Sequence, residues 1–456
     1  MSNDHATLGA AYLADEPRVD WHNKAVFNFR HLRDKVIHAN MPEWEEMRSQ
    51  ASAIKQHTLE HLDDYLLQFE AKAKENGVTV HWASTAEEHN QIVYSLIQKA
   101  KATRVVKSKS MLTEECQLNP YLEARGVEII DTDLGERIVQ MLDQPPSHIV
   151  APAIHLKKEE ISDLFNKELG TEKNNADPTY LTRAARKHLR EKFVSAQVGI
   201  TGGNFLVADS GAVVVVTNEG NADLGCHIPP IQIHCVGIEK MIPRWQDLGL
   251  FVRMLAPSAM GLLITVYTSH YMKPKAGGEM HIVLVDNGRS DQLGSVHHRN
   301  SLKCIRCSAC FNTCPVFRRT GGFSYHTVIG GPIGSILMPN KDINEYKDLP
   351  FASSLCGSCS DVCPVKIDIH NQLYKWRQEI NAKTTASTSK KIMMSFASKA
   401  LASNQGMSRI NRLIRPMLKS LPRFMIYNRL NAWGKGREMP PVPIETFDQW
   451  YKNNRS

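Results

Sequence analysis

Apolar residues recur at near-helical spacing in the first part of the chain, between residues 41 and 76. An amphipathic helix buries one face, so its apolar positions return every three or four residues. The pattern predicts long amphipathic helices, and we treat residues 1–76 as an N-terminal helical region. The positions that carry the pattern are Trp44, Met47, Ile54, Leu59, Leu62, Leu66 and Phe69.

After this region, short runs of strand-forming residues alternate with helical stretches. The runs at 78–80, 104–106 and 127–130 have strand character, and residues 86–100 between the first two have helical spacing. Strands that alternate with helices form parallel sheets covered by helices. Residues 77–295 are therefore predicted to form an α/β domain with a mostly parallel sheet.

Strand patterns crowd together between residues 199 and 286. Asp209, Ser210 and Gly211 supply turn residues between the first two runs, so these runs are predicted to form a β-hairpin. The Val213–Val216 run is typical of a strand that is covered on both faces. The predicted strands are Phe205–Ala208, Ala212–Val216, Ile231–Val236, Leu262–Tyr267 and His281–Val285.

The composition is that of a folded globular protein. Of the 456 residues, 42% are hydrophobic and 22% are charged, which excludes a fibrous repeat and wholesale disorder. The length exceeds one ordinary core, so several domains are expected. No apolar run reaches the ~18 residues of a membrane span, and the first residues lack the pattern of an export signal. We expect a cytoplasmic protein.

The net charge of +8 is concentrated in the last part of the chain. Residues 381–456 contain 14 Lys and Arg against 3 Asp and Glu, a balance of +11 that leaves −3 for the first 380 residues. We call residues 381–456 the basic C-terminal extension. It is expected to meet an acidic partner or the inner face of the membrane, and no nucleic-acid binding is expected of the body.

Seven of the ten cysteines fall between residues 304 and 363. Such clustering in a long cytoplasmic chain indicates metal ligation or redox chemistry, not disulfide bonds. The first four cysteines form the run C-x2-C-x2-C-x3-C-P, which bacterial ferredoxins use to bind [4Fe–4S] clusters. We therefore expect a ferredoxin-type iron–sulfur domain over residues 296–380. The run consists of Cys304, Cys307, Cys310, Cys314 and Pro315.

A shorter version of this run follows, with Cys356, Cys359, Cys363 and Pro364. Aligned from its proline, it has Ser353 where the first cysteine would be. In two-cluster ferredoxins, the last cysteine of each run binds the cluster of the other run. On this rule the first cluster takes Cys304, Cys307, Cys310 and Cys363, and the second takes Cys314, Cys356 and Cys359.

The second cluster thus lacks one cysteine. It is either a [3Fe–4S] cluster or a [4Fe–4S] cluster whose fourth iron is bound by Ser353, by water or by a residue of a partner. Structural zinc is the alternative for the whole set, because zinc also favours C-x2-C pairs. Zinc pairs are usually two separated C-x2-C units, however, whereas the first run here has three such cysteines before Cys-Pro.

Four basic residues lie beside the first cysteine run. Positive charge near a cluster raises its potential and attracts electronegative partners, but the same residues could form an ordinary solvated surface. Both interpretations stay open from the sequence. The residues are Lys303, Arg306, Arg318 and Arg319.

Three segments of the α/β domain are candidate ligand sites. Gly199–Asn204 could bind an anion through backbone N–H groups, or could simply make a turn. Glu219 follows a strand and is either a reactive carboxylate or a turn residue. Lys107–Ser110 could bind a phosphate or carboxylate, or could form a solvated edge.

Two further sequence features, a set of Cys and His residues and the glycine pattern of dinucleotide sites, give no evidence for a metal site or a dinucleotide site. Cys226, His227, His234 and Cys235 cannot easily converge on a metal, because residues 234 and 235 point to opposite faces of a strand. They are assigned to the core or the surface. No G-x-G-x-x-G follows a strand, so the sequence gives no support for an NAD or FAD site.

Several segments resemble the lactate utilization protein B family, the iron–sulfur subunits of bacterial lactate oxidation. The resemblance covers nearly the whole chain, and members of this family share the three-cysteine second run. In the cysteine segment it is carried by residues 300–310, 331–335 and 354–359, upstream by residues 107–111, 133–136, 202–205 and 217–221, and in the tail by residues 440–443.

The resemblance implies that the chain passes electrons during oxidation of L-lactate to pyruvate. It implies companion lactate-utilization subunits, with a redox donor and a redox acceptor protein, and a sugar-isomerase/CoA-transferase type of α/β fold. We expect a subunit without catalysis of its own, because no organic redox cofactor site is visible in the sequence and a cluster alone rarely performs hydride chemistry. The alternative is that the α/β domain is itself catalytic, or binds a small acid, CoA or a sugar phosphate, and receives electrons from the clusters.

Overall fold

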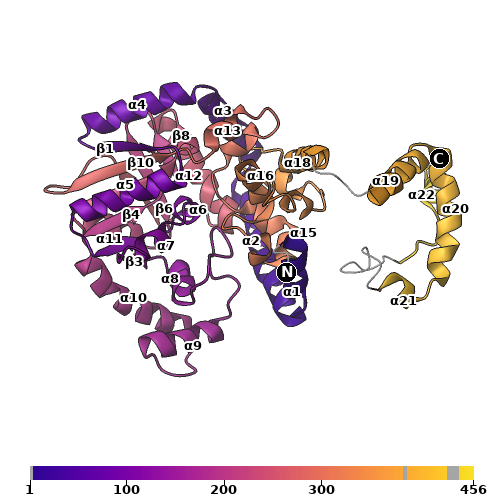
Figure 1. Ribbon diagram of the computed structural model, residues 1–456, viewed down its shortest axis with the longest axis horizontal. Helices are drawn as coiled ribbons and strands as arrows, with labels where there is room; N and C mark the ends of the chain where they lie inside the picture. The colour runs from indigo at the N-terminus through magenta and orange to yellow at the C-terminus, as the bar shows by residue number, and fades with distance from the viewer. Residues whose placement is uncertain (1–3, 384–387, 429–440, 456) are drawn as a thin grey trace. The chain divides into compact units, whose positions relative to one another are not determined.

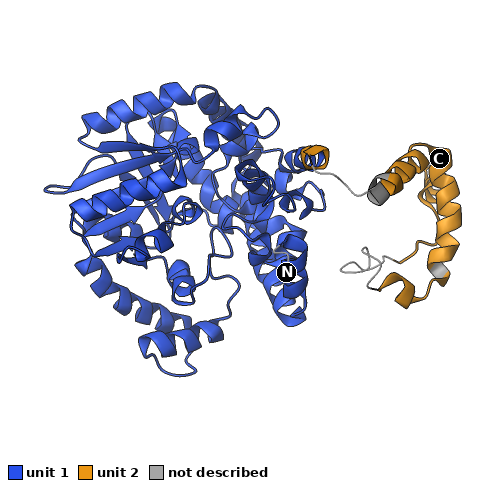
Figure 2. Ribbon diagram, viewed as in Figure 1, with its two compact units in different colours: residues 1–378 blue, residues 379–456 orange. Residues whose placement is uncertain are grey.

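The computed structural model describes residues 4–383, 388–428 and 441–455 (Figure 1). The chain divides into two compact units, residues 1–378 and residues 379–456 (Figure 2). The first unit holds the α/β domain and all the cysteines. Among the described residues, no helix is long and apolar enough to cross a membrane.

A six-stranded sheet forms the centre of the first unit, and all of its strand pairs are parallel. Because βαβ connections place helices on both faces, strands of such a sheet are buried on both sides. This confirms the predicted α/β architecture. In spatial order the strands are β1 (Thr79–Ala83), β10 (Glu279–Val285), β7 (Ile231–Gly237), β4 (Val198–Thr201), β2 (Arg104–Lys107) and β3 (Glu128–Asp131).

Side chains of successive strand residues enter different cores. Val105 of β2 packs in the core that also holds Val93 and Leu118, on the face covered by α5 (Ala86–Lys99) and α7 (Leu118–Glu123). Val106 packs on the opposite face against Leu189 and Phe193 of a long helix. The helices that connect the strands are α6 (Met111–Glu115), α8 (Leu134–Met141), α9 (Lys158–Leu169), α10 (Pro178–Ser195), α11 (Asn221–His227), η1 (Ile238–Lys240) and α12 (Trp245–Met260).

A second, four-stranded sheet packs beside the first, in the order β8 (Met241–Ile242), β5 (Phe205–Val207), β6 (Ala212–Thr217) and β9 (Tyr267–Tyr271). Strands β5 and β6 are antiparallel, which confirms the predicted hairpin. The division of the crowded strands between two sheets was not predicted, because parallel and antiparallel strands share the same local pattern of apolar residues.

The predicted strand at Leu262–Tyr267 is wrong. Helix α12 ends at Gly261 in a left-handed turn, and the strand of this region is β9, which begins at Tyr267. The apolar residues between them are exposed instead of paired, with Ile264 at 77% and Leu263 at 51%. Their apolar character suggested a strand, whereas the hydrogen-bonded partner of β6 is the more polar segment that follows.

The N-terminal helices pack against both the sheets of the α/β domain and the cysteine segment. Phe69 and Ala73 of α4 (Leu62–Glu75) share a core with Leu206 and Leu284 of the two sheets. The helices before it, α1 (His5–Leu13), α2 (Glu16–Asn40) and α3 (Trp44–Glu60), pack on the cysteine segment, and α3 and α4 confirm the predicted amphipathic helices.

The cysteine segment is built from short helices joined by loops. They are η2 (Arg299–Lys303), α14 (Ala309–Thr313), α15 (Pro315–Thr320), η3 (Phe323–Tyr325), α16 (Gly331–Lys341), η4 (Leu349–Phe351), α17 (Ser358–Asp361) and α18 (Ile369–Lys383), and α13 (Arg289–Gly294) precedes them at the end of the α/β domain. The second unit contains α19 (Thr388–Leu401), α20 (Asn404–Ser420), α21 (Arg423–Ile426) and α22 (Phe447–Asn454).

Lys107, at the end of β2, is completely buried and forms two ion pairs. Its Nζ lies 2.7 Å from Asp131 Oδ1 of β3 and 2.7 Å from Glu114 Oε1 of α6. Burial alone would lower the pKa of Lys107, but these two carboxylates raise it well above its usual value. This lysine therefore joins two strands to a helix and is neither a ligand group nor part of a solvated edge.

We expect Lys107→Met to destabilise the protein by about 3–5 kcal/mol, because it leaves two carboxylates without their cation. Lys109→Met is the matched control from the same loop, and it should cost less than about 1 kcal/mol because Lys109 is partly exposed and forms no ion pair with a described carboxylate. Chemical denaturation of both variants measures the difference. Equal losses of stability would contradict a special structural role for Lys107.

Candidate functional site

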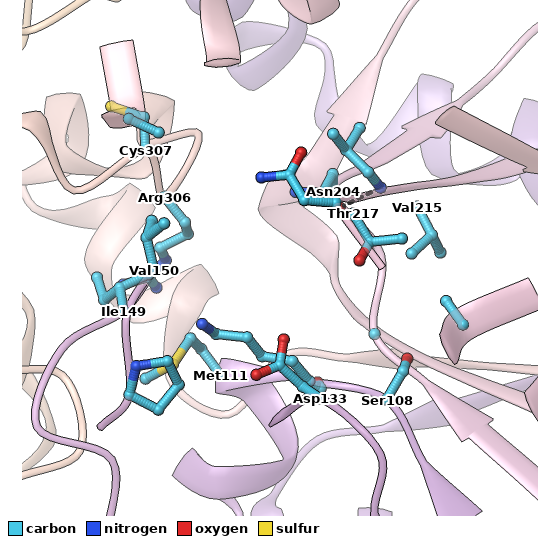
Figure 3. Close-up of a pocket in the computed structure, with 18 of the residues that line it drawn as sticks. Ser108, Met111, Asp133, Ile149, Val150, Asn204, Val215, Thr217, Arg306 and Cys307 are labelled. Atoms are coloured by element: carbon cyan, nitrogen blue, oxygen red, sulfur yellow. Dashed lines mark hydrogen bonds between the residues drawn. The ribbon is translucent and has the colours of Figure 1, made fainter. Parts of the chain in front are cut away.

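The loops that leave the parallel strands meet at one edge of the six-stranded sheet. From β2 the chain crosses to β3 on one side. From β4, which pairs with β2 on its other side, it crosses in the opposite direction to β7. At such a reversal the two following loops separate and leave a crevice, where open α/β sheets bind their ligands. A cavity of about 530 Å³ lies here (Figure 3), and its lining includes the segments after β2, β3, β4 and β7.

Two predicted ligand segments contribute to this cavity. Ser108, Lys109 and Ser110 line it after β2, and Gly202 and Gly203 line it after β4. A Cβ atom on Gly202 would lie 2.8 Å from Ser110 Oγ, and one on Gly203 would lie 2.8 Å from a Val236 methyl carbon. The two loops approach so closely that only glycine fits at 202 and 203 without movement of its neighbours.

The rest of the Gly199–Asn204 segment is structural. Gly199 lies within β4, where a Cβ atom would fall 1.7 Å from the Gly225 carbonyl oxygen. Asn204 lines the cavity, and its Oδ1 accepts a hydrogen bond of 2.8 Å from the Val216 backbone N–H. This bond fixes the amide at the start of the hairpin.

Glu219 also lines the cavity, as its position after a strand predicted. Its Oε2 accepts a hydrogen bond of 3.2 Å from the Leu134 backbone N–H. Burial and then the charge of Asp133 raise the pKa of Glu219 to about 7, and Asp133 itself caps α8 through the Gly135 and Glu136 N–H groups. Glu219 is thus a half-buried carboxyl group that titrates near neutral pH.

The Cys226, His227, His234 and Cys235 set does not converge, as expected. Cys226 and Cys235 are fully buried in two different cores, and His227 is exposed. His234 Nδ1 lies 2.6 Å from the Thr201 hydroxyl oxygen. Cys226, His234 and Cys235 belong to the packing around the sheets, and His227 lies at the surface.

The first cysteine run forms a loop in which left-handed residues alternate with cysteines. Arg306 and Ser308, on either side of Cys307, both have φ of 59°. Non-glycine residues rarely adopt this conformation, which costs roughly 1–2 kcal/mol for each one. Here it turns successive thiols toward one side of the loop, so the cost is expected to serve ligand binding.

Four cysteines surround a small internal cavity beside the larger one. Cys304, Cys307, Cys310 and Cys363 all line it. Burial, and then the charges of Cys363 and Cys304, raise the pKa of Cys307 to about 12. Such buried thiols are unreactive alone but lose their protons when they bind a metal.

The other three cysteines of the segment form a second group. Burial, and then the charges of Cys314 and Cys356, raise the pKa of Cys359 to about 12. Cys314 and Cys359 are buried, whereas Cys356 is exposed. The second group therefore opens to the surface at Cys356, whereas the first, with three buried cysteines and a half-buried Cys304, is more enclosed.

The second run repeats the backbone of the first. Leu355 and Gly357, on either side of Cys356, have φ of 55° and 81°, which makes Cys356 equivalent to Cys307. Arg306 N–H donates to Cys304 Sγ at 3.4 Å, and Leu355 N–H donates to Ser353 Oγ at 3.1 Å. The Ser353 hydroxyl thus makes the same local contact as the Cys304 thiol.

The cysteine sets fit a cluster better than a single ion. Among the described residues, no three His, Cys, Asp or Glu side chains lie close enough together to hold one metal ion. A zinc ion needs its thiolates at about 2.3 Å, whereas a cubane binds each thiolate through a different iron and so separates them. Thiols that surround a cavity match the second case.

Arginines of the N-terminal helices bind the cysteine loops from outside. Arg48 Nε donates to the Cys363 carbonyl oxygen at 3.0 Å, and its Nη2 donates to the Asp361 carbonyl oxygen at 2.6 Å. Arg33 Nη2 donates to the Val362 carbonyl oxygen at 3.1 Å. Sequence reasoning missed both arginines, because they lie more than 300 residues before the loop that they hold and belong to no local motif.

The four basic residues beside the first run do not form one solvated surface. Lys303 is buried, with its Nζ 3.2 Å from Ser52 Oγ, and Arg318 lies over the Phe27 ring at 4.1 Å. Arg306 points into the protein, with Nη2 3.9 Å from Glu239 Oε1. Of the four, only Arg319 is well exposed, and it pairs with Asp20.

A buried ionic network joins the cysteine loop to the strand ends. Arg289 lies 2.5 Å from Glu239 Oε2 and 3.0 Å from Glu115 Oε2, and Lys341 Nζ lies 3.3 Å from Glu115 Oε1. Burial alone would raise the pKa of Glu239, but Arg289, Lys240 and Arg306 hold it at about 2. Arg306 and Cys307 therefore form a wall of the strand-end cavity, opposite Asn204 and Thr217 (Figure 3).

Comparisons with known proteins identify two domains in this chain. A family model described as the LUD domain matches residues 66–290, and one described as a 4Fe-4S dicluster domain matches residues 300–367. The chain is 44% identical to Lactate utilization protein B of Bacillus cytotoxicus over 426 residues, which cover 90% of this chain and 89% of that protein. It is 43% identical, with the same coverage, to Lactate utilization protein B 2 of Bacillus mycoides and to Lactate utilization protein B of Bacillus cereus.

A solved structure shows a weaker likeness. It is the crystal structure of a DUF162 family protein from Deinococcus radiodurans, which is 11% identical, with a TM-score of 0.29. The match covers 49% of this chain and 98% of that chain. A likeness this low supports no conclusion about fold or function.

Proposed function

The chain belongs to the lactate utilization protein B family, and from that premise we propose that it carries electrons during oxidation of L-lactate to pyruvate. The observation that carries the proposal is the presence of two sets of cysteine thiols within about sixty residues. One set lies inside the protein beside the strand-end cavity, and the other is open to the surface. Two adjacent centres with different exposure suit a relay from inside the protein to a partner.

We assign the cysteines to the two centres by the crossed rule. Cys304, Cys307, Cys310 and Cys363 would hold the first, and Cys314, Cys356 and Cys359 the second. The shared lining of one cavity by the first four supports this division. Bound there, the clusters would supply one-electron redox chemistry, with potentials that depend on burial, charge and hydrogen bonds to sulfur.

Residues of this chain supply such hydrogen bonds and charges. Arg306 N–H donates to Cys304 Sγ at 3.4 Å, and Ile367 N–H donates to Cys363 Sγ at 3.3 Å. The guanidinium groups of Arg33 and Arg48 add positive charge beside the buried group. All these contacts favour the reduced, more negative state of the first centre.

We infer that Ser353 is the fourth ligand of the second centre, which would then be a [4Fe–4S] cluster. The equivalence of Ser353 and Cys304 in backbone geometry and in hydrogen bonding supports this choice over a [3Fe–4S] cluster. The exposure of Cys356 leaves water or a partner residue as the competing ligand.

The proposal includes companion lactate-utilization subunits and separate donor and acceptor proteins, so the chain is a subunit of a larger system. We keep the boundaries 1–76, 77–295, 296–380 and 381–456. The family-model matches at 66–290 and 300–367 fall mainly on the two middle segments, and the first match begins inside the predicted helical region. The sugar-isomerase/CoA-transferase likeness of the α/β domain stays a prediction. The strand-end cavity favours the second candidate function, in which this domain itself binds a small ligand.

We further propose that the basic C-terminal extension touches an anionic membrane surface. In the second unit Phe396 of α19 and Leu413 of α20 are each 74% exposed, and Arg409 and Arg412 lie near Leu413 in sequence. Exposed apolar residues and arginines on one amphipathic helix are typical of peripheral membrane binding.

The crossed assignment predicts which signals each cysteine variant loses. In oxygen-free protein, Cys304→Ala or Cys363→Ala should remove the paramagnetic signal of one centre, and Cys314→Ala or Cys356→Ala that of the other. Low-temperature electron paramagnetic resonance of oxidised and reduced samples measures this, with circular dichroism as the control for folding. Loss of both signals in either pair of folded variants would contradict the assignment.

Ser353 variants test the fourth ligand. Ser353→Cys should retain a four-iron centre with a shifted potential, whereas Ser353→Ala should convert the second centre to a three-iron form, because one iron loses its only protein ligand. Iron analysis and the same resonance measurement distinguish these forms. A four-iron second centre with unchanged spectrum in Ser353→Ala would show that water or a partner supplies the ligand.

The membrane proposal predicts binding to vesicles that contain phosphatidylglycerol but not to pure phosphatidylcholine vesicles. Binding should weaken as salt rises, and the double variant Arg409→Gln/Arg412→Gln should weaken it roughly tenfold or more, at about 1 kcal/mol per charge. Cosedimentation of the full-length protein measures this. Equal binding to both vesicle types, or binding to neither, would contradict an electrostatic membrane contact.

A further inference from the structure

The carboxylates that line the strand-end cavity are already engaged by the protein. Asp133 caps α8, and Glu219 accepts a hydrogen bond from the backbone of the same helix. Glu239 and Glu115 are both paired with Arg289 in the buried network. The acidic groups of this cavity therefore have little capacity left for a cation.

Two lysines and one hydroxyl group of the cavity are not engaged in this way. Lys109 and Lys240 form no ion pair with any carboxylate among the described residues. Ser108 is 6% exposed, and its Oγ has no hydrogen-bond partner within the described chain; the same holds for Nη1 of Arg306. Lys109 is partly exposed and can meet an anion, and unpartnered buried polar atoms such as Ser108 Oγ are otherwise costly.

The two ends of the cavity differ in chemistry. One end is the crevice between β2 and β4, where Lys109 and the hydroxyls of Ser108 and Ser110 lie beside the Gly202–Gly203 loop. Backbone and hydroxyl groups with one lysine are typical of phosphate binding at strand ends. The other end holds Cys307, with Arg306, Ile149 and Val150 beside it (Figure 3).

An apolar wall runs along the cavity. It is formed by the last turns of α12, by the 149–153 loop and by Met111, and its residues include Leu255, Ala256, Ala259, Met260, Val150 and Pro152. At about 530 Å³ the space is far larger than a three-carbon acid, which fills only roughly a fifth of it if it occupies as much as about three waters. Both observations favour a ligand with a large apolar body.

We propose that this cavity binds a flavin-type mononucleotide, that is, a planar redox-active ring that carries one phosphate group. The phosphate lies at Lys109 and the Gly202–Gly203 loop, and the ring lies along the α12 wall toward Cys307. A single phosphate needs one glycine turn and not the G-x-G-x-x-G pattern of dinucleotide sites, so the absence of that pattern does not exclude it.

This inference rests on the proposed function, because the ring is placed against the loop that would hold the first centre. Hydride chemistry on a hydroxy acid requires an organic carrier, which the cysteines alone do not provide. The inference therefore gives the α/β domain a ligand of its own.

The test compares flavin mononucleotide with riboflavin, which has the same ring without the phosphate. Full-length protein, purified oxygen-free with its centres intact, is titrated with each compound, and quenching of flavin fluorescence reports binding. We expect flavin mononucleotide to bind at least tenfold more tightly than riboflavin. Lys109→Met should remove this difference and leave the affinity for riboflavin within about twofold, and Ser108→Ala should weaken only flavin mononucleotide, by several-fold.

Three results would overturn the inference: no saturable binding of flavin mononucleotide, equal affinity for the two compounds, or unchanged affinity in both variants. Paramagnetic resonance of the same samples separates this outcome from a failure of the proposed function. If the centres are intact but flavin mononucleotide does not bind, only the proposed flavin site is rejected. If the protein contains no iron–sulfur centres, the proposed electron relay is rejected. A change of the resonance signal on addition of flavin mononucleotide would support the placement of the ring near Cys307.

Discussion

Two buried carboxylates, Glu115 and Glu239, hold the cysteine segment against the ends of the parallel strands. Both are paired with Arg289, and each also has a basic neighbour from the cysteine segment: Lys341 for Glu115 and Arg306 for Glu239. Buried ion pairs add little net stability, but breaking one is costly, so they select one geometry over others. That geometry makes Arg306 and Cys307 part of the cavity wall. Without it, the strand-end cavity and the cysteine loop would be separate sites.

The same selection of geometry appears in the two cysteine loops. Left-handed residues flank Cys307 and Cys356 alike, and strained backbone of this kind persists only where the surroundings hold it in place. The surroundings here include the N-terminal helices, whose Arg33 and Arg48 bind carbonyl groups of the second loop. A segment at the start of the chain thus completes a site near residue 363, and the cysteine segment is not an independent ferredoxin that has been appended to an enzyme-like domain.

The sequence was informative where a local pattern has a local cause. The alternation of strands and helices predicted the parallel sheet, the Asp209–Gly211 turn predicted the hairpin, and cysteine spacing predicted the metal-binding loops. It failed where the cause lies far away in the chain. The exposed run around Ile264 has the apolar character of a strand. The sequence around Lys107 does not show that its partner is Asp131 on the next strand. Nothing in the sequence near Arg48 indicates that it binds the backbone of Cys363. Likewise, the sequence did not predict that Lys240 and the 149–153 loop line the cavity, because their positions depend on the order of the strands in the sheet.

Burial gives the proposed relay two different ends. The first group of thiols lies inside the protein and shares the wall residues Ile149, Arg306 and Cys307 with the strand-end cavity, whereas the second group reaches the surface at Cys356. A redox partner therefore has access to the second group, and a small ligand in the cavity has access to the first. If electrons entered from the partner instead, they would end in a cavity whose free groups are basic and whose carboxylates are occupied, a site suited to stabilise an added negative charge. The arrangement thus allows electron transfer in both directions, and the difference in reduction potential between the ligand and the partner determines the direction.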